Sequence, residues 1–554
     1  MLKAIELLRQ GRNEELWQMC CGYLGLNIRE FMNIQESLLL EQLELLNKCA
    51  LGEKIMRGAK PKNLEEFRHQ VPLTTYSDYC PDLLEKREDI LPAKPEQWGR
   101  TSGKSGEYPC KWVPLTSAYT YELSTIGYGV AILSTCRGWG DVSQMKERLK
   151  IVYALASRPY FSGVIAYAIE QQTPTDFLPS VEEAEKLSFE ERIKLGFKLA
   201  LNQGFDYFLG LSLVLVKVGN MFSQVSDKTA ILPLLSQPKT LLRLIKGMIK
   251  SKLARRPIMP KDVWTIRGIL CGGLDSTVYK DKIKELWGRH PLDVYGGTEF
   301  GVIATQTWDY DGMTFVPSLN LLEFIPEEEH FKWQLDHSYQ PKTVLLDEVE
   351  VGKTYELVIT NFHGGAMIRY KPGDMIRITS LRNEKLGIDI PQMVFERRAD
   401  DIIDFGVIRL TERVIWQAIE NSGIPYEDWV AQKEVGEDMA LHLLVELKDG
   451  CQASAEDVAN AVYNKILESS DVGSNTAAEI RGDFEKMIDF RVEATILPSG
   501  TFTIYTERRR AEGADLAHLK PPHVNPSGEV LELLVTKPEK ARAGAETEAE
   551  EAAV

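Results

Sequence analysis

A short run of small hydroxyl and glycine residues around a lysine has the chemistry of a phosphate-binding loop. The run is Thr101-Ser102-Gly103-Lys104-Ser105-Gly106, and Lys111 follows five residues after its last glycine. Backbone N–H groups, hydroxyls and an ammonium in one loop can all turn toward a polyphosphate. A Walker P-loop would need glycine where Trp98 stands, since Gly99 is one residue out of register. The run predicts a phosphate loop of another type, with a solvated turn as the alternative.

A second group with possible chemistry is Tyr295-Gly296-Gly297-Thr298-Glu299. Two successive glycines let the backbone approach a flat ring closely, and the Glu299 carboxylate then reaches outward. A hard oxygen ligand there suits Mg²⁺ bound to phosphates, because that ion takes few protein carboxylates and keeps several waters. The alternative interpretation is a tight turn with Glu299 on the surface.

Two further polar groups suit a nucleotide sugar. Asp374 ends the run Arg369-Tyr-Lys-Pro-Gly-Asp374, and a carboxylate after a glycine turn can accept both hydrogen bonds of a ribose diol. Arg398 lies in Glu396-Arg-Arg-Ala-Asp-Asp401, which Gly406 follows, and a guanidinium is a fixed fork for phosphate or ribose oxygens. An ordinary turn residue and a solvated charge run are the alternatives.

A late lysine, Lys520, lies in Ala517-His-Leu-Lys-Pro-Pro-His523. An ammonium placed against both a carboxylate and an α-phosphate would neutralise the charge that gathers in a transition state between them. An exposed loop lysine is the alternative.

These five groups occur in an order that resembles the adenylate-forming superfamily, which includes acyl-CoA synthetases and luciferases. The resemblance spans roughly residues 70 to 525. The Thr-Ser-Gly-x-Ser-Gly loop and the segments Ser318–Pro326 and Tyr355–Thr360 are most similar to the auxin-responsive-promoter family of acyl-acid amido synthetases. The Lys-Pro-Pro-His ending resembles bacterial members of that family.

The resemblance implies an enzyme that activates a small carboxylic acid with ATP and Mg²⁺. It implies that residues 101–106 bind phosphates, that Tyr295 to Thr298 bind the nucleotide, and that Asp374 binds ribose with help from Arg398. Glu299 would be catalytic and bind Mg²⁺, and Lys520 would be the catalytic lysine.

The acceptor of the acyl group stays open between an amino acid and coenzyme A. Lys104 stands where a Thr is usual in the family, and Lys111 follows one residue later than is common. The segment Asn361-Phe-His-Gly-Gly-Ala-Met-Ile is nearer to ordinary acyl-CoA ligases than to plant amido synthetases. The alternative from another class is a non-catalytic nucleotide-binding protein.

Composition limits the partners and the compartment. The net charge of −16 argues against a general nucleic-acid binder, whose phosphate contacts need a basic face. The eight cysteines show no metal-binding spacing and indicate a reducing compartment. The longest apolar stretch, about Phe205 to Val218, is too short to span a bilayer. We therefore expect a cytoplasmic protein with no membrane partner.

The pattern of segments predicts an α/β protein with a large domain of doubly wound, mostly parallel sheets. The expected domains are 1–400, which would bind acid and ATP, a small mobile α+β domain over 401–530, and a disordered acidic tail over 531–554. Residues 1–70 are expected to be helical, and Ser188 with Glu191 predicts a capping box. The apolar runs Leu211–Val218 and Val263–Cys271 are expected to be buried strands.

Local signals define the elements of the small domain. Thr411 and Gly423 predict the two ends of a helix, and Ser454 predicts the start of another that runs toward Leu467. Met439 to Leu447 and Phe490 to Leu497 are expected to be strands. In the large domain, Gly352 predicts a turn into a strand over residues 355–360.

Overall fold

The structure is a computed structural model, and it describes residues 3–101, 110–156, 158–224, 238–272, 276–336, 338–399, 402–405, 409–435, 439–468, 490–511, 521–526 and 528–535. The chain divides into two units, Met1–Ala399 and Asp400–Val554. No helix within these ranges combines the length and the apolar character that crossing a membrane requires.

Several helices of the first unit begin after a capping side chain. Asn27 accepts a hydrogen bond from the backbone N–H of Glu30, and the predicted capping box of Ser188 and Glu191 is confirmed. The helices are α1 Ala4–Arg9, α2 Asn13–Cys21, α3 Ile28–Leu46, α4 Ala50–Ile55, α5 Leu64–Gln70, α6 Ser117–Leu133, α7 Phe161–Gln172, α8 Val181–Ala184, α9 Phe189–Gln203, α10 Ser212–Gln224, α11 Pro238–Leu253, α12 Pro260–Val263, α13 Ser276–Trp287 and α14 Glu327–Leu335. The expected helical region over residues 1–70 is thus confirmed.

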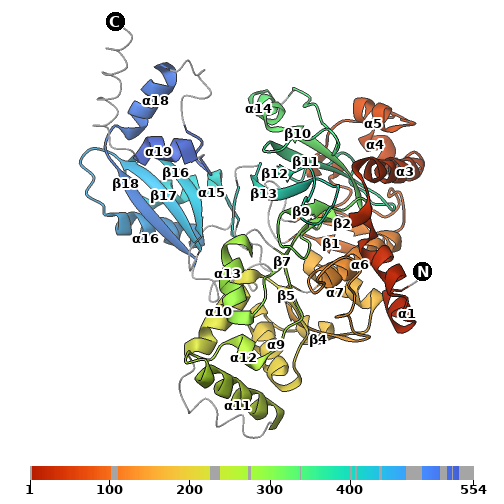
Figure 1. The fold of residues 1–554 in the computed structure, drawn as a ribbon. Helices are drawn as coiled ribbons and strands as arrows, with labels where there is room; N and C mark the ends of the chain where they lie inside the picture. Colours follow the sequence, from red (N-terminus) through yellow and green to blue (C-terminus); the bar gives the residue numbers. More distant parts are fainter. Residues whose placement is uncertain are drawn as a thin grey trace, which may run out of the picture. The chain divides into compact units, whose positions relative to one another are not determined.

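Apolar segments between these helices form the strands (Figure 1). They are β1 Gln97–Arg100, β2 Trp112–Leu115, β3 Leu149–Ala154, β4 Thr175–Leu178, β5 Tyr207–Gly210, β6 Gly268–Gly272, β7 Leu292–Gly297, β8 Gly301–Thr305, β9 Met313–Phe315, β10 Asn320–Pro326, β11 Thr354–Asn361, β12 Asp374–Ser380 and β13 Gln392–Arg398. The predicted turn at Gly352, whose φ is +81°, leads into β11 as expected.

Among the described residues, 11 strands form one sheet, ordered β10-β11-β12-β13-β9-β8-β7-β6-β5-β3-β4. Strands β4, β3, β5, β6 and β7 are neighbours in that order and are parallel. The chain forms β3 and β4 first and then returns past β3 to add β5, β6 and β7, which is the arrangement of a doubly wound fold. The strands beyond β7 pair antiparallel. The α/β class is confirmed, and the parallel strands make up one half of this sheet.

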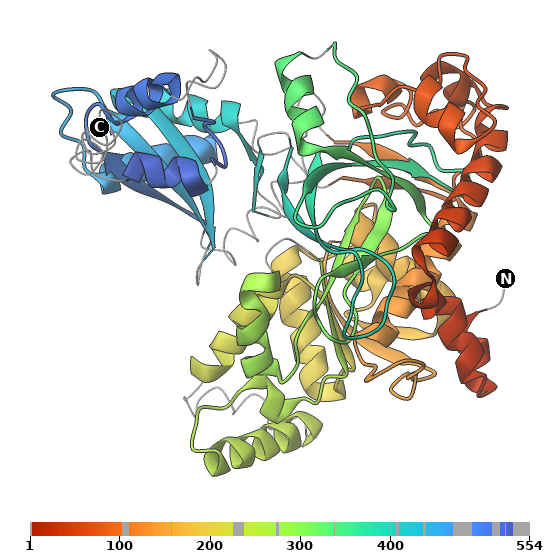
Figure 2. The ribbon, with the colours of Figure 1, turned by 45° about the horizontal axis from the view of Figure 1, so that its top comes forward.

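Helices cover both faces of the parallel strands. Helices α6 and α7 lie on one side, and α9, α10 and α13 lie on the other (Figure 2). Right-handed connections between parallel strands require this placement, because the strand order reverses after β4. In such a sheet, ligands bind beyond the carboxyl ends of the strands. The end of β7, at Gly297, is one of those positions.

Two apolar runs fold differently from the prediction. Residues 211–218 lie mainly in helix α10, because a run that is apolar all round fits a buried helix as well as a buried strand. In the second run only residues 268–271 are strand, since Pro260 opens the short helix α12 that ends at Val263.

The second unit has a three-stranded sheet, β16-β17-β18, within the described residues. Its elements are β14 Ile402–Asp404, β15 Arg409–Thr411, α15 Glu412–Ser422, β16 Tyr426–Val435, β17 Met439–Leu447, α16 Ala455–Glu468, β18 Arg491–Leu497, α18 Thr501–Ala511 and α19 Gly528–Val535. The caps predicted at Thr411, Gly423 and Ser454 are confirmed. Residues 531–535, predicted as the start of a disordered tail, are helical in α19, where Leu534 is buried in an apolar cluster; residues 536–554 lie outside the described residues.

Candidate active site

The ends of the predicted phosphate loop are held together by a hairpin. Strands β1 and β2 pair antiparallel, and the loop connects them. Just past the strands, the N–H of Thr101 donates to the carbonyl of Lys111 at 3.0 Å, and the N–H of Lys111 donates to Oγ1 of Thr101 at 2.9 Å. Thr101 and Lys111 therefore form the base of this loop, and both are buried.

The second predicted group forms the end of β7 and the turn into β8. Gly297 pairs with Gly301 across this turn, so Thr298, Glu299 and Phe300 are its tip. A Cβ on Gly296 would lie 2.6 Å from the Gly301 carbonyl oxygen, and one on Gly297 would lie 2.6 Å from the Phe300 ring. The tightness of this turn is thus a sufficient reason for both glycines.

Glu299 is buried, which excludes the interpretation of a surface turn residue. The residue is 9% exposed, and its backbone carbonyl accepts a hydrogen bond from Nδ2 of Asn361 at 3.0 Å. Asn361 also donates to Oδ1 of Asn320, whose own Nδ2 donates to the carbonyl of Phe300. The two asparagines therefore fix the backbone on which the Glu299 carboxylate is carried.

Lys111 brings the base of the phosphate loop to Glu299. Its Nζ lies 3.2 Å from Oε1 of Glu299 and donates to the hydroxyl of Tyr370 at 2.8 Å. The Tyr370 hydroxyl in turn donates to Oε1 of Glu299 at 3.3 Å. One ammonium, one carboxylate and one phenol from three distant parts of the sequence thus form a buried triangle.

Charges within this triangle shift its ionisation. Burial raises the pKa of Glu299, but the Lys111 ammonium, a backbone hydrogen bond and the Arg398 guanidinium together outweigh burial and hold that pKa below its ordinary value. Burial and the Glu299 carboxylate raise the pKa of Tyr370 well above its ordinary value. Glu299 is therefore an anion and Tyr370 a neutral donor across the pH range of most enzymes.

A second polar cluster is centred on Asp374. Asp374 opens β12, and Arg398 is its direct partner across β13. Nη1 of Arg398 binds Oδ1 of Asp374, while the hydroxyl of Tyr295 donates to Oδ2 at 2.5 Å. The guanidinium also donates to the carbonyl of Pro372 at 3.0 Å. The structure thus joins three residues that the sequence singled out separately.

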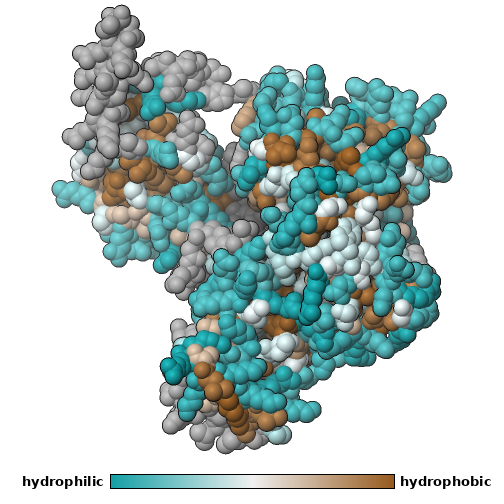
Figure 3. Space-filling view, in the orientation of Figure 1, coloured by the Kyte–Doolittle hydropathy of each residue, from teal (hydrophilic) through white to brown (hydrophobic). Residues whose placement is uncertain are grey.

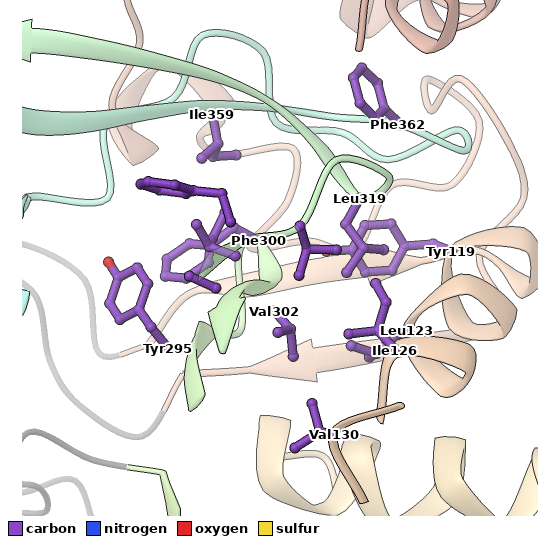
Figure 4. Close-up of a cluster of buried hydrophobic side chains, with 14 of the residues drawn as sticks. Tyr119, Leu123, Ile126, Val130, Tyr295, Phe300, Val302, Leu319, Ile359 and Phe362 are labelled. Atoms are coloured by element: carbon purple, nitrogen blue, oxygen red, sulfur yellow. The ribbon is translucent and has the colours of Figure 1, made fainter. Parts of the chain in front are cut away.

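Tyr295 connects the two clusters, because it lies on β7 four residues before Glu299. Its ring packs against Phe300 with the ring centres 5.6 Å apart. Figure 4 shows that the Tyr295 hydroxyl points away from the apolar cluster that includes Leu123 and Val302. Burial and the Asp374 carboxylate raise the pKa of Tyr295 well above its ordinary value, which keeps its hydroxyl a donor.

Arg369, within the Arg-Tyr-x-x-Gly-Asp group, makes contacts that stabilise the fold. Its Nη2 and Nε contact the Glu323 carboxylate at 2.8 and 3.1 Å, and its Nη1 donates to the carbonyls of Arg68 and Val71 at 2.6 Å each. Both partners in this ion pair are buried. Arg369 therefore joins the segment after α5 to the sheet and orients the following Tyr370.

Sequence reasoning did not identify Tyr370, Asn361 and Asn320 as site residues. Tyr370 was within a quoted motif, but nothing in the motif shows where its phenol points. The asparagines lie in β10 and β11, which pair with each other directly at Asn320 and Asn361. A polar residue in each of two apolar strands was the signal that could have found them.

Several predicted site residues lie outside the described residues. These are Ser102, Gly103, Lys104, Ser105, Gly106 and Lys520, together with Asp400, Asp401 and Gly406 of the hinge segment. Thr101, Tyr295, Gly296, Gly297, Thr298, Glu299, Asp374 and Arg398 are described, and all belong to the first unit.

The carboxylate ligands at this site suit Mg²⁺ only when the ion is already bound to a polyphosphate. In the portion of the chain that the structure describes, no group of three or more His, Cys, Asp or Glu could hold a metal ion. Mg²⁺ bound to a nucleotide needs just one or two protein carboxylates, with phosphate and water oxygens as its other ligands. The ionised Glu299 beside the phosphate loop fits that requirement.

Family models match two segments of the chain. The GH3 family N-terminal domain matches residues 26–170, and the GH3 family central domain matches residues 313–398. The first segment contains Thr101 and Lys111, and the second contains Tyr370, Asp374 and Arg398. The family predicted from the sequence is thus confirmed.

Curated relatives and a solved structure agree with this family. The chain is 27% identical over 291 residues to jasmonoyl–L-amino acid synthetase GH3.5 of Oryza sativa subsp. japonica, covering 49% of this chain and 47% of that protein. It is 25% identical over 239 residues to 4-substituted benzoates-glutamate ligase GH3.12 of Arabidopsis thaliana, covering 40% and 38%. The alignments thus span less than half the length of these relatives.

The fold resembles that of a solved acyl acid amido synthetase, AtGH3.15 in complex with 2,4-DB. The TM-score is 0.50 with 15% identity, and the match covers 93% of this chain and 95% of that one. At this identity the likeness concerns the fold alone.

Proposed function

We propose, from the two GH3 family domains that the chain contains and from the site geometry, that it is an ATP-dependent acyl-acid amido synthetase. It would activate a carboxylic acid as an acyl-adenylate and transfer the acyl group to an amino acid. The observation that carries the proposal is the contact of Lys111, at the base of the phosphate loop, with the buried Glu299 carboxylate. If the loop were only a solvated turn and Glu299 only a surface turn residue, a buried contact between Lys111 and Glu299 would not be expected.

A free carboxylate is a poor acylating agent because oxide is a poor leaving group, and adenylation replaces oxide by AMP. A carboxylate oxygen attacks the α-phosphorus of ATP, the bond to the bridging oxygen breaks, and pyrophosphate leaves with its electron pair. The product is a mixed anhydride of the acid and AMP. An amine nitrogen then attacks the acyl carbon, AMP leaves, and the amine loses a proton to give the amide.

The first cluster would act on the phosphates. The loop over residues 101–106 would bind the β- and γ-phosphates, with Lys111 adding positive charge at its base. A fixed cation near a leaving pyrophosphate stabilises charge that develops in the transition state. Glu299 and Tyr370 hold the lysine ammonium in place through contacts of 3.2 and 2.8 Å. The Glu299 carboxylate would also hold Mg²⁺, which would neutralise phosphate charge.

The second cluster would bind the nucleoside. The Asp374 carboxylate at the start of β12 contacts the Arg398 guanidinium and the Tyr295 hydroxyl, and a carboxylate oxygen can accept more than one hydrogen bond. It could therefore accept the hydroxyls of a ribose, while the ring of Tyr295 and the backbone of Gly296 to Thr298 would lie along the base. Lys520 would bridge the acid and the α-phosphate.

The relatives indicate which acids to test first. Their names specify jasmonoyl, 4-substituted benzoate and indole-3-acetic acid groups, which all combine one carboxylate with an apolar body. We propose an acid of that type for this chain. The acceptor would be an amino acid, as the names of the jasmonoyl and benzoate relatives state for theirs.

Coenzyme A remains the second candidate acceptor because of the segment that begins at Asn361. Asn361 holds the backbone of Glu299 and also accepts a hydrogen bond from the N–H of Met367. The part of the sequence that resembles acyl-CoA ligases is therefore built into the candidate site.

Product analysis separates these proposals. The protein would be incubated with ATP, Mg²⁺, a panel of aryl and alkyl carboxylic acids, and either the twenty amino acids or coenzyme A. We expect masses of acyl–amino acid conjugates and release of AMP. Acyl-CoA products would replace the amide proposal by the thioester one, and ATP binding without any AMP release would support the non-catalytic alternative.

Lys520→Ala tests the lysine role. We expect adenylation to fall on the order of 10²-fold or more while ATP still binds. Adenylation at the wild-type rate in this variant would remove Lys520 from the mechanism.

A further inference from the structure

Helix α11, Pro238–Leu253, is packed with its small residues inward. Its buried side chains are Thr240, Gly247 and Ser251, whereas a surface helix ordinarily buries its large apolar residues. A Cβ on Gly247 would lie 2.9 Å from a methyl of Val263, so this face needs glycine to fit. The hydroxyl of Ser251 donates to the carbonyl of Arg256 at 2.6 Å, which satisfies the polar group on this face.

The large apolar residues of α11 lie on its outer face. Leu242 is 56% exposed, Ile245 44%, Ile249 55% and Leu253 81%. Their spacing of three or four residues places them in one continuous stripe. Met248, at 49% exposure, widens it. Figure 3 shows this stripe as a brown band along the helix.

Lysines accompany the stripe at regular spacing. Lys239, Lys246 and Lys250 each lie three residues before a stripe residue, and all three are exposed. Within the part of the chain that the structure describes, none of the three forms an ion pair. The segment 238–261 contains no Asp or Glu, although the whole chain carries a net charge of −16. Its basic residues are Lys239, Arg243, Lys246, Lys250, Lys252, Arg255, Arg256 and Lys261.

From this arrangement we propose that the outer face of α11 binds the surface of an anionic lipid bilayer. The stripe would enter the boundary between headgroups and acyl chains, and the lysines would contact lipid phosphates. An amphipathic helix with basic residues beside its apolar face lies in the plane of a membrane in this way. A helix of 16 residues would present about 24 Å of this face.

The composition of the stripe favours lipid over other occupants. Protein interfaces are rich in aromatic residues, methionine and arginine and poor in lysine, while this stripe consists mainly of Leu and Ile beside lysines. A second copy of the chain would bring two basic faces together, which like charges oppose. A nucleic acid would leave the apolar stripe in water. The sequence analysis predicted no membrane partner because no segment could span a bilayer, but a surface helix needs no span.

The test is co-sedimentation of the full chain with sucrose-loaded vesicles. One vesicle type contains phosphatidylcholine alone, and the other contains phosphatidylcholine with one third phosphatidylserine. We expect binding to the second type, weakened by salt as the lipid charge is screened. Ile245→Gln/Ile249→Gln and Lys239→Gln/Lys246→Gln/Lys250→Gln are each expected to weaken binding by about tenfold or more.

Matched controls use exposed residues elsewhere. Leu381→Gln/Ile504→Gln removes two exposed apolar side chains, and Lys48→Gln/Lys62→Gln/Lys385→Gln removes three exposed charges. Both control variants should bind as the wild type does. Thermal melts of all variants should coincide with that of the wild type, because every substituted side chain is exposed.

A second measurement places the stripe in the bilayer. Tryptophan at position 249, introduced as Ile249→Trp, is expected to be quenched by lipids brominated on the acyl chain, beyond the quenching of the wild type. Absence of vesicle binding by the wild type would overturn the proposal. So would binding that the stripe and lysine variants do not reduce. Loss of a dimer in the Ile245→Gln/Ile249→Gln variant, without vesicle binding, would instead make this face an interface between copies.

Discussion

The Nζ atom of Lys111 lies 3.2 Å from Oε1 of Glu299, and both side chains are buried. The two residues are far apart in the sequence and come from different hairpins, β1–β2 and β7–β8. Their contact places the base of the predicted phosphate loop beside the carboxylate that is proposed to bind Mg²⁺. Most of the proposed chemistry depends on this pair.

Replacing Lys111 by methionine should slow adenylation on the order of 10²-fold, because a fixed cation near the leaving phosphates is lost. The pKa of Glu299 should also rise, since burial then acts on it without the opposing ammonium. The acid limb of the pH–rate profile should therefore move to higher pH. The initial rate of AMP formation, measured across pH, checks both effects.

Lys371→Met is the matched control for that variant. Lys371 directly follows Tyr370, but its Nζ, on a side chain that is 7% exposed, lies 3.6 Å from Oε1 of a different buried carboxylate, Glu356. Its loss should leave the pH profile in place. Equal effects of the two substitutions would mean that Lys111 serves only the fold.

The Asp374 cluster predicts discrimination between nucleotides. If Asp374 accepts hydrogen bonds from a ribose diol, the wild type should bind ATP more tightly than 2′-deoxy-ATP, by roughly tenfold, because a hydrogen bond to a charged group contributes about 1.5–3 kcal/mol. Asp374→Asn should weaken ATP binding and abolish most of that preference. Calorimetric titration of both nucleotides into both proteins decides the matter. An unchanged preference in the variant would remove Asp374 from the ribose site.

The buried Arg369–Glu323 pair predicts a loss of stability. Arg369→Met removes the closer cation of the buried Glu323 carboxylate and leaves Arg68 at 3.8 Å, so the free energy of unfolding of the first unit should fall by about 3 kcal/mol. Arg377→Met breaks an exposed pair with Glu396 and should cost about 1 kcal/mol or less. Urea denaturation compares the two variants, and similar losses would contradict a structural role for Arg369.

His523 predicts a pH dependence of the second unit. Burial lowers the pKa of His523, but hydrogen bonds to Asp428 and Glu412 outweigh it and raise the pKa to about 9. A pKa raised above the unfolded value stabilises the fold fully below about pH 6.5, and this contribution is lost as the pH rises through about 9. Because the group is partly solvated, the loss should be about 1–2 kcal/mol.

Thermal unfolding between pH 6 and 10 measures this contribution. His523→Gln should be less stable than the wild type at pH 6 and close to it at pH 10. A constant difference across that range would show that the contacts of His523, including its stacking on Trp429, stabilise without the charge.

Local signals predicted the elements, and long-range pairing determined the site. Helix α15 begins and ends at Thr411 and Gly423 as predicted, because the capping hydroxyl and the left-handed glycine are properties of single residues. Residues 211–218 were predicted as strand and are mainly helix, because a wholly buried run has no periodicity to read.

The clusters of the site could be predicted only as separate motifs. Asp374 and Arg398 become partners through the register of β12 and β13, which shifts between Met375 and Ile376. Neither this register shift nor the direction of the Tyr370 phenol can be predicted from the spacing of residues in the sequence. The family resemblance supplied the order of the motifs, and the fold shows which of their described side chains touch.

The most direct test of adenylation at this site is ATP–pyrophosphate exchange across a panel of carboxylic acids, with and without Mg²⁺. The account predicts exchange that requires both an acid and Mg²⁺ in the wild type, and that falls on the order of 10²-fold in Lys111→Met. Absence of exchange with every acid, from protein shown to bind ATP, would contradict it.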